Sequence, residues 1–314
     1  MKSNIVNATM MKVVPVAKYV AAAAVIQTSV ANATVISGNS DAYALGVDIN
    51  VAGELLTVDV TAPSGVSGSA PAPYNINNNV LDAEVDLGAG VTVGNLLDVQ
   101  AAALADETLL GATASSNVDG GMGARMTSAT ATVNDLSLDV VNTTFLSVIT
   151  DTAVNLSSST IYSEASVAGD YGDFDAMGSS YIEDLSINLF GLGELDLASL
   201  GLEVDADGFI AASPNFEVLD VSGIAGLNLI LNEQYGSCND MFCSMGVNAL
   251  RLSFNAVDLS GLGLNLSGLL DGDIVIGHSY AEMSAQINEV PAPATLGIFG
   301  LVMLALGFTE RRAG

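Results

Sequence analysis

Most of the chain alternates apolar and polar residues over short stretches, which is the periodicity of a β-strand with one buried face. Clear examples are Val91–Asp98, Thr130–Val141 and Ser180–Leu189. Turn sequences rich in Gly, Pro and Asp separate such stretches, among them Ala62-Pro63-Ser64-Gly65 and Asp119-Gly120-Gly121. Because helix-length amphipathic segments are few, the pattern predicts an all-β fold.

Three segments repeat one arrangement of small and large residues: Gln100–Leu104, Ser163–Val167 and Ser279–Met283. The period of two places the central alanine of each segment on the same face as the large residue two positions later. Small beside large residues on one face favours sheets that pack closely. The opposite face carries Glu164 and Glu282 and is expected to be wetter.

A second element recurs as Val133–Leu138 and Ile182–Ile187. In each copy the apolar positions shift by one residue at an aspartate, Asp135 or Asp184. A regular strand cannot keep one face buried through such a shift. We therefore expect a β-bulge or a tight turn at both aspartates.

Residues 34–289 are numerous enough for one large all-β domain or two smaller ones, and we assign them to one exported, acidic β domain. Its expected fold is an antiparallel β-sandwich of long strands. A β-solenoid is the alternative, because the Gly- and Leu-rich segments Leu189–Leu202 and Leu259–Leu270 are compatible with stacked coils.

The first 33 residues have the pattern of a secretory signal peptide with a short signal helix. Two lysines precede the apolar run Tyr19–Ile26, and Ala31-Asn32-Ala33 follows it as an A-x-A site. This order predicts cleavage after Ala33. An uncleaved N-terminal anchor is the alternative, although the run is well below the roughly 20 residues that span a bilayer.

The last 25 residues, 290–314, have three parts. Val290-Pro291-Ala292-Pro293 comes first, the apolar run Leu296–Phe308 follows as a short hydrophobic helix, and Arg311 and Arg312 stop it. If the middle of the chain is exported, the arginine pair stays in the cytoplasm, in keeping with the positive-inside rule. A buried helix of the globular domain is a poor alternative, because the run is not amphipathic.

This tail resembles the PEP-CTERM sorting signal, which exosortases recognise in Gram-negative bacteria. The resemblance rests on the Val-Pro-x-Pro motif, the short apolar helix and the terminal arginines, and it departs at Ala292, where that family usually has glutamate. It implies an exosortase-like processing enzyme, transient or lasting insertion in the inner membrane, cleavage near the proline motif, and delivery to the cell surface or exopolysaccharide matrix.

The stretch from Tyr43 to Leu189 resembles the extracellular part of bacterial "choice-of-anchor P" proteins. The residues that carry this resemblance are Ala42–Val47, Val91-Thr92-Val93-Gly94 and the Ala- and Ser-rich strand pairs described above. The resemblance implies an exported surface protein and provides no catalytic residues to transfer.

The formal net charge is −28, and it is unevenly distributed. Between the two ends, 34 acidic residues face only two cations, Arg125 and Arg251. Nucleic-acid binding needs clustered Lys or Arg and is therefore not expected. The excess of negative charge keeps the domain soluble but makes it repel itself at low ionic strength. We infer a saline or divalent-rich setting.

Cys238 and Cys243 are the only cysteines, and in an exported protein two cysteines this close predict a local disulfide that closes a surface loop. A metal site would need more ligands nearby, and redox motifs usually have two residues between the cysteines.

Two acidic groups are candidate calcium ligands, although no cofactor is required. Glu203, Asp205 and Asp207 have the spacing of the start of an EF-hand loop, but the twelfth position is Pro214 rather than glutamate. The second group is an oxygen-rich turn formed by Asp170, Asp173 and Asp175. Both groups are equally compatible with solvated turns of a very acidic protein.

His278 is the only histidine, and the repeat alignment makes it an ordinary sheet residue on the wetter face. No G-x-S-x-G elbow, phosphate-binding loop or paired-histidine metal motif occurs in the sequence. The absence of Trp and the small number of Tyr give little support to a lectin. Calcium-bridged contact with acidic exopolysaccharide remains open.

These patterns predict an exported cell-surface or matrix protein with a structural or adhesive role, and not an enzyme. The alternative is an exported hydrolase that uses a carboxylate pair on envelope or matrix polysaccharide. Carboxylates gathered in a deep cleft would favour the hydrolase, and carboxylates spread over a convex surface would favour the structural role.

The charge imbalance predicts that salt stabilises the protein. Raising NaCl from 10 mM to 500 mM shortens the range of charge repulsion from about 30 Å to a few ångströms, so the midpoint of thermal unfolding should rise. Melts followed by circular dichroism at the two concentrations test this. Equal midpoints would contradict it.

Overall fold

The computed structural model describes residues 32–51, 56–62, 65–80, 91–93, 97–100, 109–145, 148–189, 202, 209–210, 212–220, 226–258 and 269–288. The chain divides into two compact units. One is formed by Ala33–Ile287 and the other by the two ends of the chain, Met1–Asn32 and Asn288–Gly314. The predicted signal helix and the apolar run Leu296–Phe308 lie outside the described residues.

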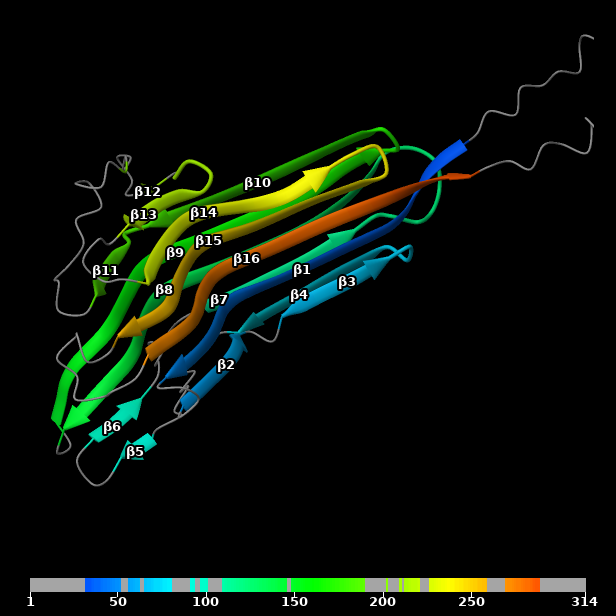
Figure 1. Ribbon diagram of the computed structural model, residues 1–314. Helices are drawn as coiled ribbons and strands as arrows, with labels where there is room; N and C mark the ends of the chain where they lie inside the picture. The colour runs from blue at the N-terminus through cyan, green and yellow to red at the C-terminus, as the bar shows by residue number, and fades with distance from the viewer. Residues whose placement is uncertain are drawn as a thin grey trace, which may run out of the picture. The chain divides into compact units, whose positions relative to one another are not determined.

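The described residues of the larger unit form two sheets, and the first joins N-terminal strands to C-terminal ones (Figure 1). Within the described part, its seven strands are β13 (Phe216–Asp220), β14 (Leu227–Cys238), β15 (Phe242–Asp258), β16 (Leu269–Asn288), β1 (Asn32–Val51) and β2 (Leu56–Ala62) in this order, with β3 (Val66–Ala70) also paired to β1.

The second sheet is formed by the middle of the chain. Its nine described strands are β12 (Phe209–Ile210), β10 (Asp173–Glu183), β9 (Val148–Asp170), β8 (Arg125–Phe145), β6 (Leu97–Gln100) and β5 (Val91–Val93) in this order, with β11 (Ser186–Leu189) paired to β9, and β7 (Leu109–Ser116) paired to β8 and to β4 (Tyr74–Val80). Neighbouring strands run antiparallel.

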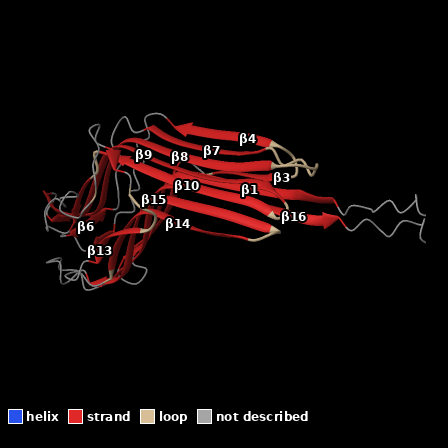
Figure 2. Ribbon diagram, turned by 90° about the horizontal axis from the view of Figure 1, so that it is seen from above, coloured by secondary structure: helices blue, strands red, loops and turns tan. Residues whose placement is uncertain are grey.

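The two sheets pack against each other, because β9 and β10 of the second sheet lie against β15 of the first. Figure 2 shows the long strands side by side. Strands β8 and β9 have 21 and 23 residues, well beyond the usual three to ten or so. The antiparallel sandwich of long strands is therefore confirmed, and the strands that the structure describes do not form the alternative β-solenoid. The Gly- and Leu-rich segments lie almost entirely outside the described residues.

Small side chains fill much of the interior. Ala165 and Val167 of β9 lie in one buried cluster with Ala281 and Met283 of β16, which confirms the predicted inner face for two of the three repeated segments. Ala102 and Leu104 of the first segment lie outside the described residues. A second cluster is composed mainly of alanines: Ala42, Val66, Ala112, Ala114, Ala129 and Ala131. Larger aliphatic side chains such as Leu110, Leu138 and Leu156 fill the rest of the interior.

The predicted change of face at Asp135 and Asp184 is present, but its cause differs from a β-bulge. Both residues have left-handed backbone angles, with φ of 53° and 52°. The register with β9 is the same on both sides of each aspartate. Asn134 pairs with Thr160 and Leu136 with Ser158 around Asp135, and around Asp184, which separates β10 from β11, Glu183 pairs with Thr160 and Ser186 with Ser157. A bulge would have shifted this register. A short polar side chain such as aspartate is among the few that tolerate the left-handed region.

The first sheet makes the same change at a corresponding level. Asn232 of β14 and Gly277 of β16 have φ of 50° and 67°, and pairing is again unshifted across them. Here two neighbouring residues face inward, whereas at Asp135 two neighbours face outward. The extra residue on one face thus points toward the interior in the first sheet and toward solvent in the second. Both sheets therefore bend in the same direction and stay in contact, as Figure 1 shows for the long strands. A buried hydrogen bond of 2.6 Å between Ser163 and Ser279 joins the sheets nearby.

The left-handed backbone at Asp135 predicts how substitutions act there. Asp135→Val should lower the free energy of unfolding by about 1–2 kcal/mol, because a β-branched side chain clashes in this conformation. Asp135→Asn should be nearly neutral. Ser137→Val is the control, since the same side chain two residues along β8 suits an ordinary strand. Urea unfolding measures all three, and equal stability of the two valine variants would contradict the prediction.

Candidate functional site

The outer face of the first sheet gathers polar and aromatic side chains from four adjacent strands, β14, β15, β16 and β1. We call this surface the polar face, and its residues are Asp41, Tyr43, Glu233, Tyr235, Asn248, Arg251, Asp273, His278, Tyr280 and Glu282. It contains the only histidine of the chain and one of the two cations between its ends.

The bend determines which side chains reach this face. Asn248 and Arg251 are three residues apart in β15, so strict alternation would place them on opposite faces. Two neighbouring buried residues between them shift the alternation, and both side chains therefore point outward. The same shift in β16 brings Asp273 to the face that carries His278.

Arg251 is held by two carboxylates from different strands. Its Nη1 donates to Glu233 Oε1 at 2.9 Å, while Nε and Nη2 donate to the two oxygens of Asp273 at 3.2 Å. Ser253 also donates to Asp273, at 2.5 Å. The hydrogen bonds with Asp273, together with those to Glu233, raise the pKa of Arg251, because they stabilise the charged guanidinium.

The hydrogen bonds continue from Glu233 to His278. Asn248 donates from Nδ2 to Glu233 Oε2 at 2.6 Å, which directs its Oδ1 toward His278 Nδ1 at 2.7 Å. His278 Nε2 lies 3.1 Å from Asp41 Oδ2. Both ring nitrogens thus have an oxygen atom of a neighbouring side chain within hydrogen-bond distance. The chain of contacts from Asp273 to Asp41 ties β14, β15, β16 and β1 together.

Three tyrosines lie among these groups. Tyr43 stacks on His278 with ring centroids 4.4 Å apart, and burial raises the pKa of its hydroxyl to about 12. The rings of Tyr235 and Tyr280 are 6.4 Å apart and inclined by 23°. Tyr280 donates to Glu282 at 2.7 Å; burial first, and then this bond, raises its pKa to about 12.

His278 lies on the predicted face but is less exposed than predicted. The side chains of Tyr43, Asn248 and Asp41 surround it, so the residue is buried. Its two ring nitrogens are bonded to an amide and a carboxylate rather than to a serine hydroxyl. This arrangement is not that of a serine nucleophile and its base.

The disulfide between Cys238 and Cys243 is confirmed. The two residues pair across the hairpin that joins β14 to β15, where Asn239 closes the turn by accepting hydrogen bonds from the backbone of Met241 and Phe242. The bridge therefore closes a short surface loop, as expected.

The candidate aspartates that the structure describes are not grouped around a common point. Asp170 and Asp173 pair across the turn between β9 and β10, Asp175 follows on β10, and Asp170 accepts a hydrogen bond from the backbone N–H of Tyr171. Among the described residues, no three His, Cys, Asp or Glu side chains are grouped closely enough to hold a metal ion. The other three candidates, Glu203, Asp205 and Asp207, lie outside the described residues.

The predicted processing signals fall mainly outside the described residues. This is the case for Ala31 and for the sorting residues Val290, Pro291, Ala292, Pro293, Arg311 and Arg312. Ala33 is the second residue of β1, so cleavage after it would leave the strand to start at Thr34. Among the described residues, no helix is both long enough and apolar enough to span a bilayer.

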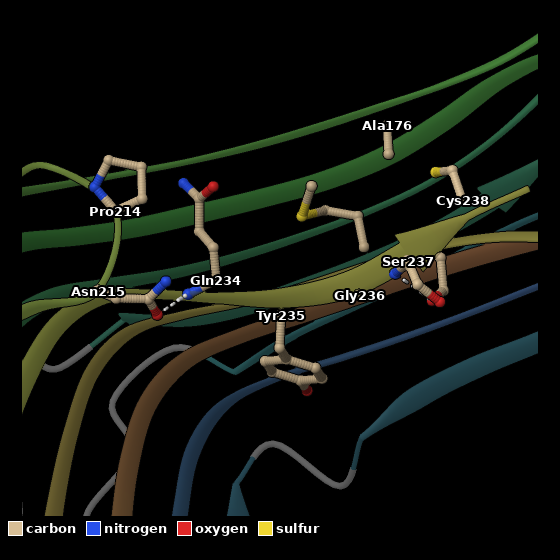
Figure 3. A pocket seen from close by; sticks show the side chains of 10 residues that line it. Ala176, Pro214, Asn215, Gln234, Tyr235, Gly236, Ser237 and Cys238 are labelled. Atoms are coloured by element: carbon tan, nitrogen blue, oxygen red, sulfur yellow. Dashed lines mark hydrogen bonds between the residues drawn. The ribbon is translucent and has the colours of Figure 1, made fainter.

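A pocket of about 340 Å³ lies at the edge of the sandwich near the disulfide (Figure 3). Its lining residues are Ala176, Pro214, Asn215, Gln234, Tyr235, Gly236, Ser237, Cys238, Ser244 and Met245. Gln234 and Tyr235 point to opposite sides of β14 (Figure 3), and Gln234 donates to the carbonyl of Gly178 in β10 at 3.0 Å. No carboxylate lines this pocket, so it offers no pair for glycoside hydrolysis.

Sequence reasoning did not find the polar face, because its residues come from strands that are distant in the chain. One signal was available, however. With only two arginines among 34 acidic residues, each arginine is expected to lie beside carboxylates, and Arg251 does. No comparable signal singles out Tyr235 or Tyr280.

The two carboxylates around Arg251 predict a large effect of removing its charge. Arg251→Ala should lower the free energy of unfolding by about 1–2 kcal/mol, since Glu233 and Asp273 would lose a charged partner. Arg125→Ala is the matched control and should have a smaller effect, because its partner Asp119 lies on an exposed turn. Urea unfolding at fixed ionic strength measures both, and similar losses would contradict the prediction.

The chain was compared with protein families, with curated proteins and with solved structures, and none of them matches it. The features that bear on function are therefore the ends of the chain, its disulfide and the polar face. No activity is transferred from a relative.

Proposed function

We propose that this chain is an exported protein of the cell surface or exopolysaccharide matrix of a Gram-negative bacterium, with a structural or adhesive role. The observation that carries the proposal is the order of the last 25 residues: a proline motif, the apolar run Leu296–Phe308 and the pair Arg311 and Arg312. Together with the signal-peptide pattern of residues 1–33, this order is that of a chain which crosses the inner membrane and is then sorted.

The disulfide supports export. Bridges such as Cys238–Cys243 form and persist in oxidising compartments, whereas cytosolic reductants keep most thiols reduced. An exosortase-like enzyme is the expected processing partner, and the inner membrane is the expected site of transient or lasting insertion.

The sandwich supports a structural or adhesive role. Its long strands enclose an apolar interior, and the charged side chains that the structure describes lie outside it, where partners can reach them. Divalent ions, calcium among them, could bridge these carboxylates to an acidic exopolysaccharide. The hydrolase alternative gains no support from the pocket near the disulfide, since that pocket contains no carboxylate.

Cell fractionation tests the proposal in a Gram-negative host that carries an exosortase. The full chain should reach the cell surface or matrix fraction, while a version that ends at Glu289 should be exported but not retained there. A version with Arg311→Gln and Arg312→Gln keeps the apolar run and isolates the effect of the charges; it should be retained less than the full chain.

A cytoplasmic full chain would refute export, and equal partition of the full and shortened chains would refute the sorting role. The control is Arg125→Ala, which lies in the β domain and should partition like the full chain. If Arg125→Ala is also missing from the surface or matrix fraction, the loss reflects misfolding rather than sorting. Retention is then compared only among versions that are equally resistant to protease.

A further inference from the structure

The polar face combines a flat aromatic surface with fixed carboxylates, and we propose that it binds an uncharged polysaccharide. The inference rests on the proposed surface or matrix location, which gives the face access to such polymers. It also reverses the expectation from the sequence, where the absence of Trp and the low number of Tyr argue against sugar binding. The tertiary structure brings Tyr43, Tyr235 and Tyr280 to one face.

Tyr235 has the geometry of a stacking platform. It pairs with Gly246 of β15, and a Cβ at Gly246 would overlap the Tyr235 ring. The ring therefore lies on the bare backbone of that glycine. Tyr235 is 45% exposed, and the ring of Tyr280 lies beside it with centroids 6.4 Å apart. The C–H groups of a sugar ring carry slight positive charge and pack well on the negative face of such a ring.

Fixed hydrogen-bonding groups lie beside the platform. Gly246 also pairs with Tyr280, whose hydroxyl donates to Glu282 Oε2, while Asn39 donates to Glu282 Oε1 at 2.6 Å. Asp41 is held through one oxygen by His278 and is 45% exposed. A carboxylate has about four acceptor positions, so Asp41 and Glu282 keep capacity to accept hydrogen bonds from sugar hydroxyls without moving.

Charge decides which class of polysaccharide fits. The polar face contains four carboxylates, those of Asp41, Glu233, Asp273 and Glu282, against the cations Arg251 and, when protonated, His278. Arg251 is already bound to two of the carboxylates. An acidic polymer would therefore be repelled by the face itself, whereas an uncharged polymer meets hydroxyl acceptors and no repulsion.

Another aromatic cluster shows why exposure alone is not enough. Tyr181 on the outer face of the second sheet is 38% exposed. One of its ring faces is stacked on Tyr162 at 4.9 Å, and Phe209 contacts it at 81°. Tyr181 is therefore similar to Tyr235 in residue type and exposure, but two rings contact it, at 4.9 and 5.4 Å, whereas Tyr280 lies 6.4 Å from Tyr235. It provides the matched control.

Affinity electrophoresis of the purified full chain tests the proposal. Native gels would contain laminarin, galactomannan, hydroxyethyl cellulose or dextran as uncharged polymers, and alginate as the acidic polymer, each without divalent ions. We expect at least one uncharged polymer to retard the protein and alginate not to. Tyr235→Ala should weaken that retardation by about tenfold in Kd, and Tyr181→Ala should leave it unchanged.

Gly246→Ala provides a second test, because it displaces the Tyr235 ring without removing it and should also weaken retardation. Lack of retardation by all four uncharged polymers would overturn the proposal, as would equal retardation of Tyr235→Ala and the unaltered chain or equal loss in Tyr181→Ala. Circular dichroism melts confirm that each variant is folded. Surface fractionation of Tyr235→Ala separates the two ideas: sugar binding can fail while the chain still reaches the surface.

Discussion

The shift of alternation at the bend is the constraint on which the rest of the structure depends. It makes both sheets curve at one level, so that an interior of aliphatic side chains and alanines stays closed along strands of about 20 residues. It also places Arg251 and Asp273 on the face that carries Asn248 and His278. Without it, alternation would direct Arg251 into the apolar interior, where a charge without partners is very unfavourable.

The backbone conformation at the bend explains which residues lie there. Asp135, Asp184 and Asn232 are non-glycine residues with φ near +50°, and Gly277 has φ of 67°. Asp, Asn and Gly are the residues that enter this region at the lowest energetic cost. At Gly277 a Cβ would also lie within 3.0 Å of Ala249, so the close approach of neighbouring strands requires glycine there.

The first sheet offsets part of the negative charge of the domain at one place. A domain with 34 acidic residues and two cations between its ends repels itself. The structure places one of those cations, Arg251, where it bridges two carboxylates of different strands. The hydrogen bonds that run from Asp273 to Asp41 then order the side chains around Tyr235 and Tyr280. The aromatic rings of Tyr235 and Tyr280 thereby lie within a sheet face that carries four carboxylates.

The sequence by itself determined the strand content, the disulfide between Cys238 and Cys243 and the shift at Asp135 and Asp184, because these depend on residues close together in the chain. Periodicity, loop length and local backbone preference act over a few residues. The tertiary structure decided which strands are neighbours. Only the pairing of β1 with β16 brings Asp41 to His278, across 237 residues. Likewise, only pairing places Tyr235 over Gly246. No periodic pattern contains such contacts, since they depend on the register between paired strands. One pair, β1 and β16, comes from opposite ends of the domain, and the other, β14 and β15, forms a hairpin.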